Sequence, residues 1–80
     1  MVRNDEVAQN RLTISESKAT AIARKFLEQY HSPVIYKSSY IDKDSWVIAM
    51  EVGLLHEEII IVKVDSETGK IQGYEHVLPP

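Results

Sequence analysis

The 80-residue sequence contains no cysteine. A disulfide framework, a thiolate zinc site and a cysteine nucleophile are therefore all excluded, and packing alone has to hold the core together. Small size sets a second limit, because a domain of this length has little apolar interior beyond what stability requires. We therefore expect no deep cofactor cleft.

Long apolar runs and an excess of positive charge are also missing. No run approaches the roughly 20 residues that cross a bilayer, and residues 1–6 lack the apolar core of a signal peptide. Nine Lys and Arg are spread along a chain of formal net charge -3, so no basic stripe is present to neutralise phosphates. These absences predict a cytoplasmic protein that binds neither nucleic acid nor membrane.

What the chain does contain is an ordinary globular balance of 44% hydrophobic and 26% charged residues, and one clear hairpin pattern. β-Branched residues fill 59–64, give way to turn-forming residues at 65–69 and resume at Ile71. The pattern predicts two strands joined by a tight turn, with Gly69 at positive φ and Asp65 accepting hydrogen bonds from the turn's own amides.

One amphipathic helix precedes the strands, because apolar side chains recur there at three- and four-residue spacing. Ser15 is the preferred N-cap, since Ile14 before it and Ala19 after it can close a hydrophobic staple. Thr13 with Glu16 fits a capping box and is the alternative start. The apolar face of the helix consists of Ala19, Ile22, Ala23, Phe26, Leu27 and Tyr30.

The predicted fold is α+β: one N-terminal amphipathic helix packed on one face of an antiparallel sheet of about four strands, in the order α-β-β-β-β. Residues 1–12 are expected to be a flexible tail, with a short helical turn at 5–11 as the alternative, and residues 13–78 a single domain. The segment 34–41 is expected to be an edge or bent strand, which could accept an extended peptide by strand addition. The Leu54–Leu55 pair predicts a loop that folds back onto apolar surface.

Side-chain alternation divides the predicted sheet into two faces. The face toward the helix contains Trp46, Ile48, Met50, Val52, Ile60, Val62, Val64 and Ile71. The uncovered face is predicted to carry the candidate partner-binding residues Val47, Ala49, Ile59, Ile61 and Tyr74. Glu51 is expected beside them, in a cross-strand ion pair with Lys63. A homodimer or another protein or peptide partner would cover this patch; screening by Lys, Glu and Gln side chains in a monomer is the equal alternative.

No pattern in the sequence predicts a catalytic residue, so we expect a noncatalytic domain without a cofactor or metal. The segment His56-Glu57-Glu58 invites comparison with the helical His-Glu-x-x-His zinc motif. Ile60 stands where the second histidine belongs, and the segment leads into a strand instead of a helix. A metal-binding protein or enzyme that uses these three residues is the competing hypothesis.

Three segments together resemble a PepSY domain over residues 13–76. They are the Ile14-Ser15-Glu16 helix start, Trp46-Val47-Ile48, and the hairpin from Val62 to Ile71, which contains the sequence pattern Val-Asp-x-x-Thr-Gly-Lys-Ile. PepSY domains are noncatalytic modules of peptidase propeptides and cell-envelope proteins, thought to bind or restrain peptidases or other partners. The resemblance implies a binding role, with regulation of a peptidase as its specific form.

The chain also resembles the gas-vesicle accessory protein O family. This resemblance rests on residues 44–52, a strand that starts at Trp and ends in Glu-Val, and on Val64-Asp65 followed by Gly73-Tyr74. Members of that family are cytosolic assembly factors. The alternative function that it implies is therefore assistance in assembly.

Overall fold

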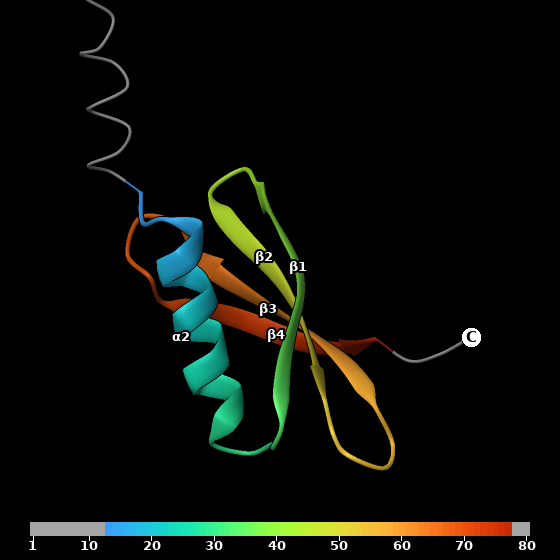
Figure 1. Cartoon of the computed structure of the whole chain (residues 1–80). Helices are drawn as coiled ribbons and strands as arrows, with labels where there is room; N and C mark the ends of the chain where they lie inside the picture. Colours follow the sequence, from blue (N-terminus) through green and yellow to red (C-terminus); the bar gives the residue numbers. More distant parts are fainter. Residues whose placement is uncertain (1–12, 78–80) are drawn as a thin grey trace, which may run out of the picture.

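The computed structural model describes residues 13–77, so the expectations for the tail at 1–12 and its turn at 5–11 lie outside the described residues. Its elements are helix α2 (Glu16–Glu28) and strands β1 (Val34–Asp42), β2 (Ser45–Val52), β3 (Glu58–Asp65) and β4 (Ile71–Val77). The strands form one antiparallel sheet in the order β1-β2-β3-β4, and α2 lies across one side of it (Figure 1). The predicted α+β architecture is confirmed. Within residues 13–77, no helix has the length and apolar character to cross a membrane.

Helix α2 begins with the predicted serine cap. Ser15 has an extended backbone, with φ -76° and ψ 163°, and its Oγ accepts a hydrogen bond of 3.0 Å from the backbone N–H of Lys18. Glu16 follows in the first turn, where a carboxylate interacts favourably with the positive end of the helix dipole. Of the two predicted starts, the structure uses Ser15.

Removing this cap should destabilise the protein measurably. We expect Ser15→Ala to lower the free energy of unfolding by about 1 kcal/mol, because the Lys18 N–H then has no acceptor within the helix. Urea unfolding followed by circular dichroism measures the change. Ser17→Ala, one exposed position inside the same turn, is the matched control and should shift stability by less than about 0.5 kcal/mol.

The core lies between α2 and the sheet. The helix contributes two alanines, Ala19 and Ala23, and both are fully buried. Small side chains there allow the helix to approach the strands closely. The buried hydrophobic residues of the cluster are Ala19, Ala23, Leu27, Val34, Ile48, Met50, Val52, Ile60, Val62 and Val64.

Three hydrogen bonds that involve backbone groups connect the start of α2, the β1–β2 turn and the β3–β4 turn at one end of the sheet. The Ile14 N–H donates to the Ser66 carbonyl oxygen at 2.6 Å, and the Ser66 N–H donates to the Asp44 carbonyl oxygen at 2.8 Å. The Trp46 indole N–H donates to the Ile14 carbonyl oxygen at 3.1 Å. Ser66 is buried, so these bonds satisfy backbone groups that water does not reach. They fix the helix relative to the strands.

The β3–β4 turn has the predicted chemistry. Gly69 has φ +78°, and its N–H donates to the Asp65 carbonyl oxygen at 2.8 Å. The Asp65 Oδ1 accepts hydrogen bonds from the N–H groups of Glu67 and Thr68 at 2.8 and 3.2 Å. A Cβ at Gly69 would lie 3.2 Å from Cδ1 of Ile22, so the turn also packs closely against the helix.

Each edge strand contains a bulge. In β1 the pairing steps from Tyr36 to Ser38, which leaves Lys37 as the additional residue. In β4 it steps from Ile71 to Gly73, which leaves Gln72 as the additional residue. A bulge shifts the alternation of side chains by one position, so residues beyond it point to the face opposite the one that uninterrupted pairing predicts.

Candidate functional site

The face of the sheet away from α2, here called the outer face, carries the central part of the predicted patch. In β2 and β3 the paired residues Ala49 and Ile61 alternate with core residues such as Ile48 and Ile60. Directly opposed residues of an antiparallel pair share a face, and alternate residues change face. By this rule the outer face includes Val47, Ala49, Ile59 and Ile61, as predicted.

The rim of the outer face is more exposed than its centre. Val47 is only 6% exposed, and Ala49, Ile59 and Ile61 are half-buried by their neighbours within the sheet. The register adds three apolar side chains from the edge strands, none of which was among the predicted patch residues: Ile35 opposite Glu51, Tyr40 opposite Val47 and Val77 opposite Ile59. All three are exposed. The apolar surface therefore extends across all four strands.

Tyr74 does not belong to this surface, so its predicted placement is wrong. It lies opposite Val62 of the core, and its ring centroid is 5.3 Å from that of Phe26 on α2. The bulge at Gln72 is the reason, because the additional residue turns Gly73 outward and Tyr74 toward the helix.

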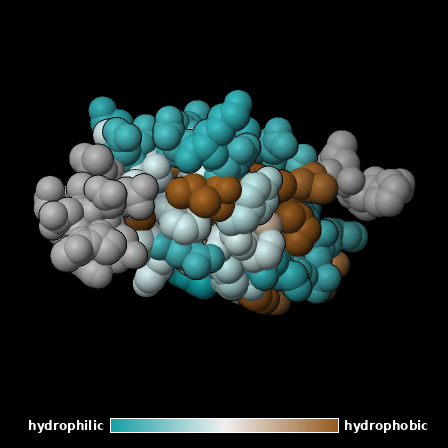
Figure 2. All heavy atoms as spheres, turned by 90° about the horizontal axis from the view of Figure 1, so that it is seen from above, coloured by the Kyte–Doolittle hydropathy of each residue, from teal (hydrophilic) through white to brown (hydrophobic). Residues whose placement is uncertain are grey.

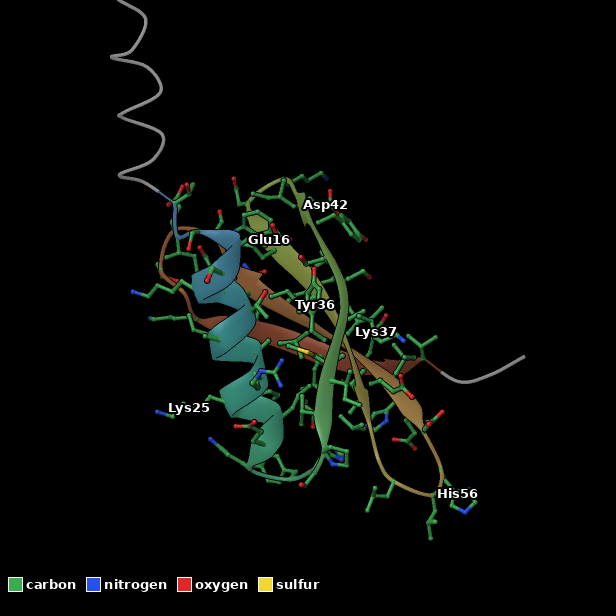
Figure 3. All side chains as sticks on the ribbon, in the orientation of Figure 1. Glu16, Lys25, Tyr36, Lys37, Asp42 and His56 are labelled. Carbon is green, nitrogen blue, oxygen red and sulfur yellow. The ribbon has the colours of Figure 1, made fainter. Side chains whose placement is uncertain are left out.

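The charged side chains of the outer face are paired differently from the prediction. Glu51 Oε1 lies 3.3 Å from Nζ of Lys37, the bulge residue of β1, whereas Lys63 lies opposite Val47. Figure 3 shows Lys37 on the side of β1 away from α2 and Tyr36 on the helix side. Charges thus interrupt the apolar surface of the outer face. Figure 2 views the molecule from above Figure 1, toward the end of the sheet, and hydrophobic side chains there also appear as separate patches among hydrophilic ones.

The loop between β2 and β3 projects beyond the sheet. Leu54 and Leu55 are 77% and 90% exposed, so the prediction that this loop folds back onto apolar surface is wrong. The last ladder pair is Val52 with Glu58, and the chain between them turns outside the sheet. Figure 3 shows His56 at the tip of this hairpin. The hairpin tip therefore presents two adjacent exposed leucines.

The residues of the competing metal hypothesis are not gathered around a common point. Glu58 begins β3, and its Oε1 lies 3.2 Å from Nδ1 of His76 on β4. His56 and Glu57 are exposed in the loop before it. Within residues 13–77, no group of three or more His, Cys, Asp or Glu side chains is arranged to hold a metal ion.

What the arrangement offers chemically is a largely apolar sheet face that carries a few charges of both signs. Comparison of the chain with protein-family models, with curated proteins and with solved structures finds no significant match.

Proposed function

We propose that this chain is a noncatalytic protein-interaction domain whose outer face binds the outer face of a second copy. One observation carries the proposal: a side of the sheet that no other described element covers carries half-buried apolar residues at its centre and exposed ones at its rim, namely Ala49, Ile59, Ile61, Ile35, Tyr40 and Val77. Sheets normally bury an apolar face against another layer of structure. A second copy supplies such a layer with the same chemistry.

The size of the face predicts a dimer that dissociates on dilution. Four strands spaced about 4.8 Å apart and about eight residues long, at about 3.3 Å per residue, present roughly 500 Å². Each partner in a stable interface buries about 800 Å². The exposed leucines at the β2–β3 tip can add to the contact, but the sheet alone falls below that size, so a permanent dimer is not expected.

The outer face carries charges of both signs. Lys37 and Lys63 lie there with Glu51, Glu75 and Asp42, which lie opposite Ile35, Ile61 and Ser45. In a dimer with twofold symmetry each patch meets its own copy, so both lysines can meet carboxylates across the interface. A strongly one-signed face would instead repel itself.

The resemblance to PepSY domains supports a binding role of this kind. A regulatory module that restrains a peptidase needs an exposed surface and no catalytic group of its own. Peptidase regulation is therefore the physiological setting that we propose for the outer face, with a second copy as the occupant in the isolated protein.

Light scattering coupled to size exclusion tests the dimer. We expect the measured mass to rise with concentration from the 9.1 kDa of one chain toward twice that value. Ile61→Lys places an additional charge at the centre of the outer face and should keep the protein monomeric over the same range, since an unpaired charge cannot be buried without a large penalty.

Gln29→Lys adds the same charge at an exposed position after α2 and is the matched control. It should dimerise as the wild type does. A wild type that stays at 9.1 kDa into the millimolar range overturns the proposal, and so does a dimer that survives Ile61→Lys. Circular dichroism of each variant confirms that the mass is that of the folded chain.

A further inference from the structure

Tyr74 lies on the helix side of the sheet and helps to line a cavity there. A cavity of about 300 Å³ lies between the end of α2 and strand β4. It is lined by Phe26, Leu27, Tyr30, His31, Tyr74 and His76. We call it the aromatic pocket. It lies on the face opposite to the one that forms the proposed dimer.

Three aromatic rings shape this pocket. The ring of Phe26 packs edge-on against Tyr30, with centroids 6.3 Å apart and an interplanar angle of 74°, and lies 5.3 Å from the ring of Tyr74. Both tyrosines are well exposed, Tyr30 by 71% and Tyr74 by 57%. An exposed aromatic ring attracts a cation placed over its electron-rich face.

The electrostatic surroundings favour positive charge. The pocket is at the carboxyl end of α2, where the N–H groups of Tyr30 and His31 both donate to the Leu27 carbonyl oxygen and where the helix dipole is negative. The Oε1 atom of Glu58 lies 3.2 Å from Nδ1 of His76, which lines the pocket. No lysine or arginine lines the cavity, and Figure 3 shows Lys25, the basic residue of the last helical turn, pointing away from the sheet.

Strand β4, which lines the aromatic pocket, has a free edge with which a peptide backbone can pair. Among the described residues β4 pairs only with β3, so its other edge has backbone N–H and C=O groups without a strand partner. An extended peptide can pair with such an edge, and its side chains then alternate between the two faces of the sheet. A side chain on the helix side near Tyr74 would enter the aromatic pocket.

We propose that the groove between α2 and β4 binds an extended peptide segment whose arginine or lysine side chain occupies the aromatic pocket. Arginine fits best, because its planar guanidinium stacks on aromatic rings and keeps its charge. The proposal goes beyond the dimer and does not depend on it, since the two surfaces lie on opposite faces of the sheet.

The test uses three short peptides that differ at one position: acetyl-Thr-Val-Arg-Val-Thr-amide and its citrulline and glutamate versions. Citrulline has nearly the shape of arginine without the charge. Amide chemical shifts of the labelled full chain report binding. We expect the arginine peptide to shift amides of β4 and of the end of α2, and to bind at least tenfold more tightly than either other peptide.

Tyr30→Ala and Tyr74→Ala should each weaken the arginine peptide several-fold, whereas Tyr40→Ala, a tyrosine 60% exposed on the outer face, should not. Tyr30 is the more exposed of the pocket tyrosines, so its variant keeps the test valid if Tyr74→Ala fails to fold. Repeating the titration with Ile61→Lys separates this site from the dimer. The proposal is overturned if the citrulline peptide binds equally well, if the shifts map to β1 and β2 instead of β4 and the end of α2, or if no peptide binds at millimolar concentration.

Discussion

Leu27→Ala is expected to lower the free energy of unfolding by about 2–5 kcal/mol. Leu27 is 1% exposed and is the last buried residue of α2, after Ala19 and Ala23. Its removal leaves a void that neither the helix nor the strands can fill without moving. Small domains are stable by only about 5–15 kcal/mol, so this one change should remove a large part of the total.

Urea unfolding monitored by far-ultraviolet circular dichroism measures this loss. Leu55→Ala makes the same chemical change at a site that is 90% exposed, and should alter stability by less than about 0.5 kcal/mol. A comparable loss in both variants would contradict the burial that the structure assigns to these leucines. The pair thus tests the layer of contacts that holds α2 on the sheet.

The helix and the β3–β4 hairpin could be predicted because several local signals agree there. Ser15 precedes a regular apolar period, and the structure shows its Oγ capping the helix. The turn residues Asp65 and Gly69 are bounded by β-branched segments, and each makes the expected contacts. Signals of this kind lie within a few residues of one another, so the sequence alone contains them.

The face of Tyr74 could not be predicted, because it depends on a bulge that has no unambiguous sequence signal. Gln72 and Gly73 fit regular pairing and a bulge equally well, and a tyrosine suits either face of a sheet. In the folded chain Tyr74 contacts Phe26, a helix residue far from it in the sequence, and this contact is on the helix side of the sheet. The bulge has a large consequence, because it places the ring of Tyr74 in the aromatic pocket instead of on the outer face.

On the outer face, residues of the central strands could be predicted and residues of the edge strands could not. Ala49 and Ile61 could be assigned correctly because β2 and β3 pair without a shift of register. No face could be assigned to Tyr40 from the sequence, because the bulge at Lys37 interrupts the alternation of β1. The same bulge provides Lys37 as the partner of Glu51. Edge strands are where register shifts concentrate, and both rims of the proposed interface are edge strands.

Gly53→Ala is expected to destabilise the protein by about 1–3 kcal/mol, through the backbone alone. Gly53 has φ +98°, in a region that L side chains rarely adopt, and a Cβ there would lie 2.6 Å from the carbonyl oxygen of His56. That oxygen belongs to the backbone of the tight β2–β3 loop, so it cannot rotate away as a side chain could. The loop must open or the strand ends must shift.

Gly73→Ala is the matched control, because a Cβ at Gly73 meets no atom within 4 Å and its φ is not positive. Its stability should change by less than about 0.5 kcal/mol, or rise slightly as the unfolded chain loses freedom. Urea unfolding compares the two variants directly. Equal losses would mean that the β2–β3 loop tolerates a side chain at Gly53, and the protruding leucine tip would then be less rigidly placed beside the outer face than the structure indicates.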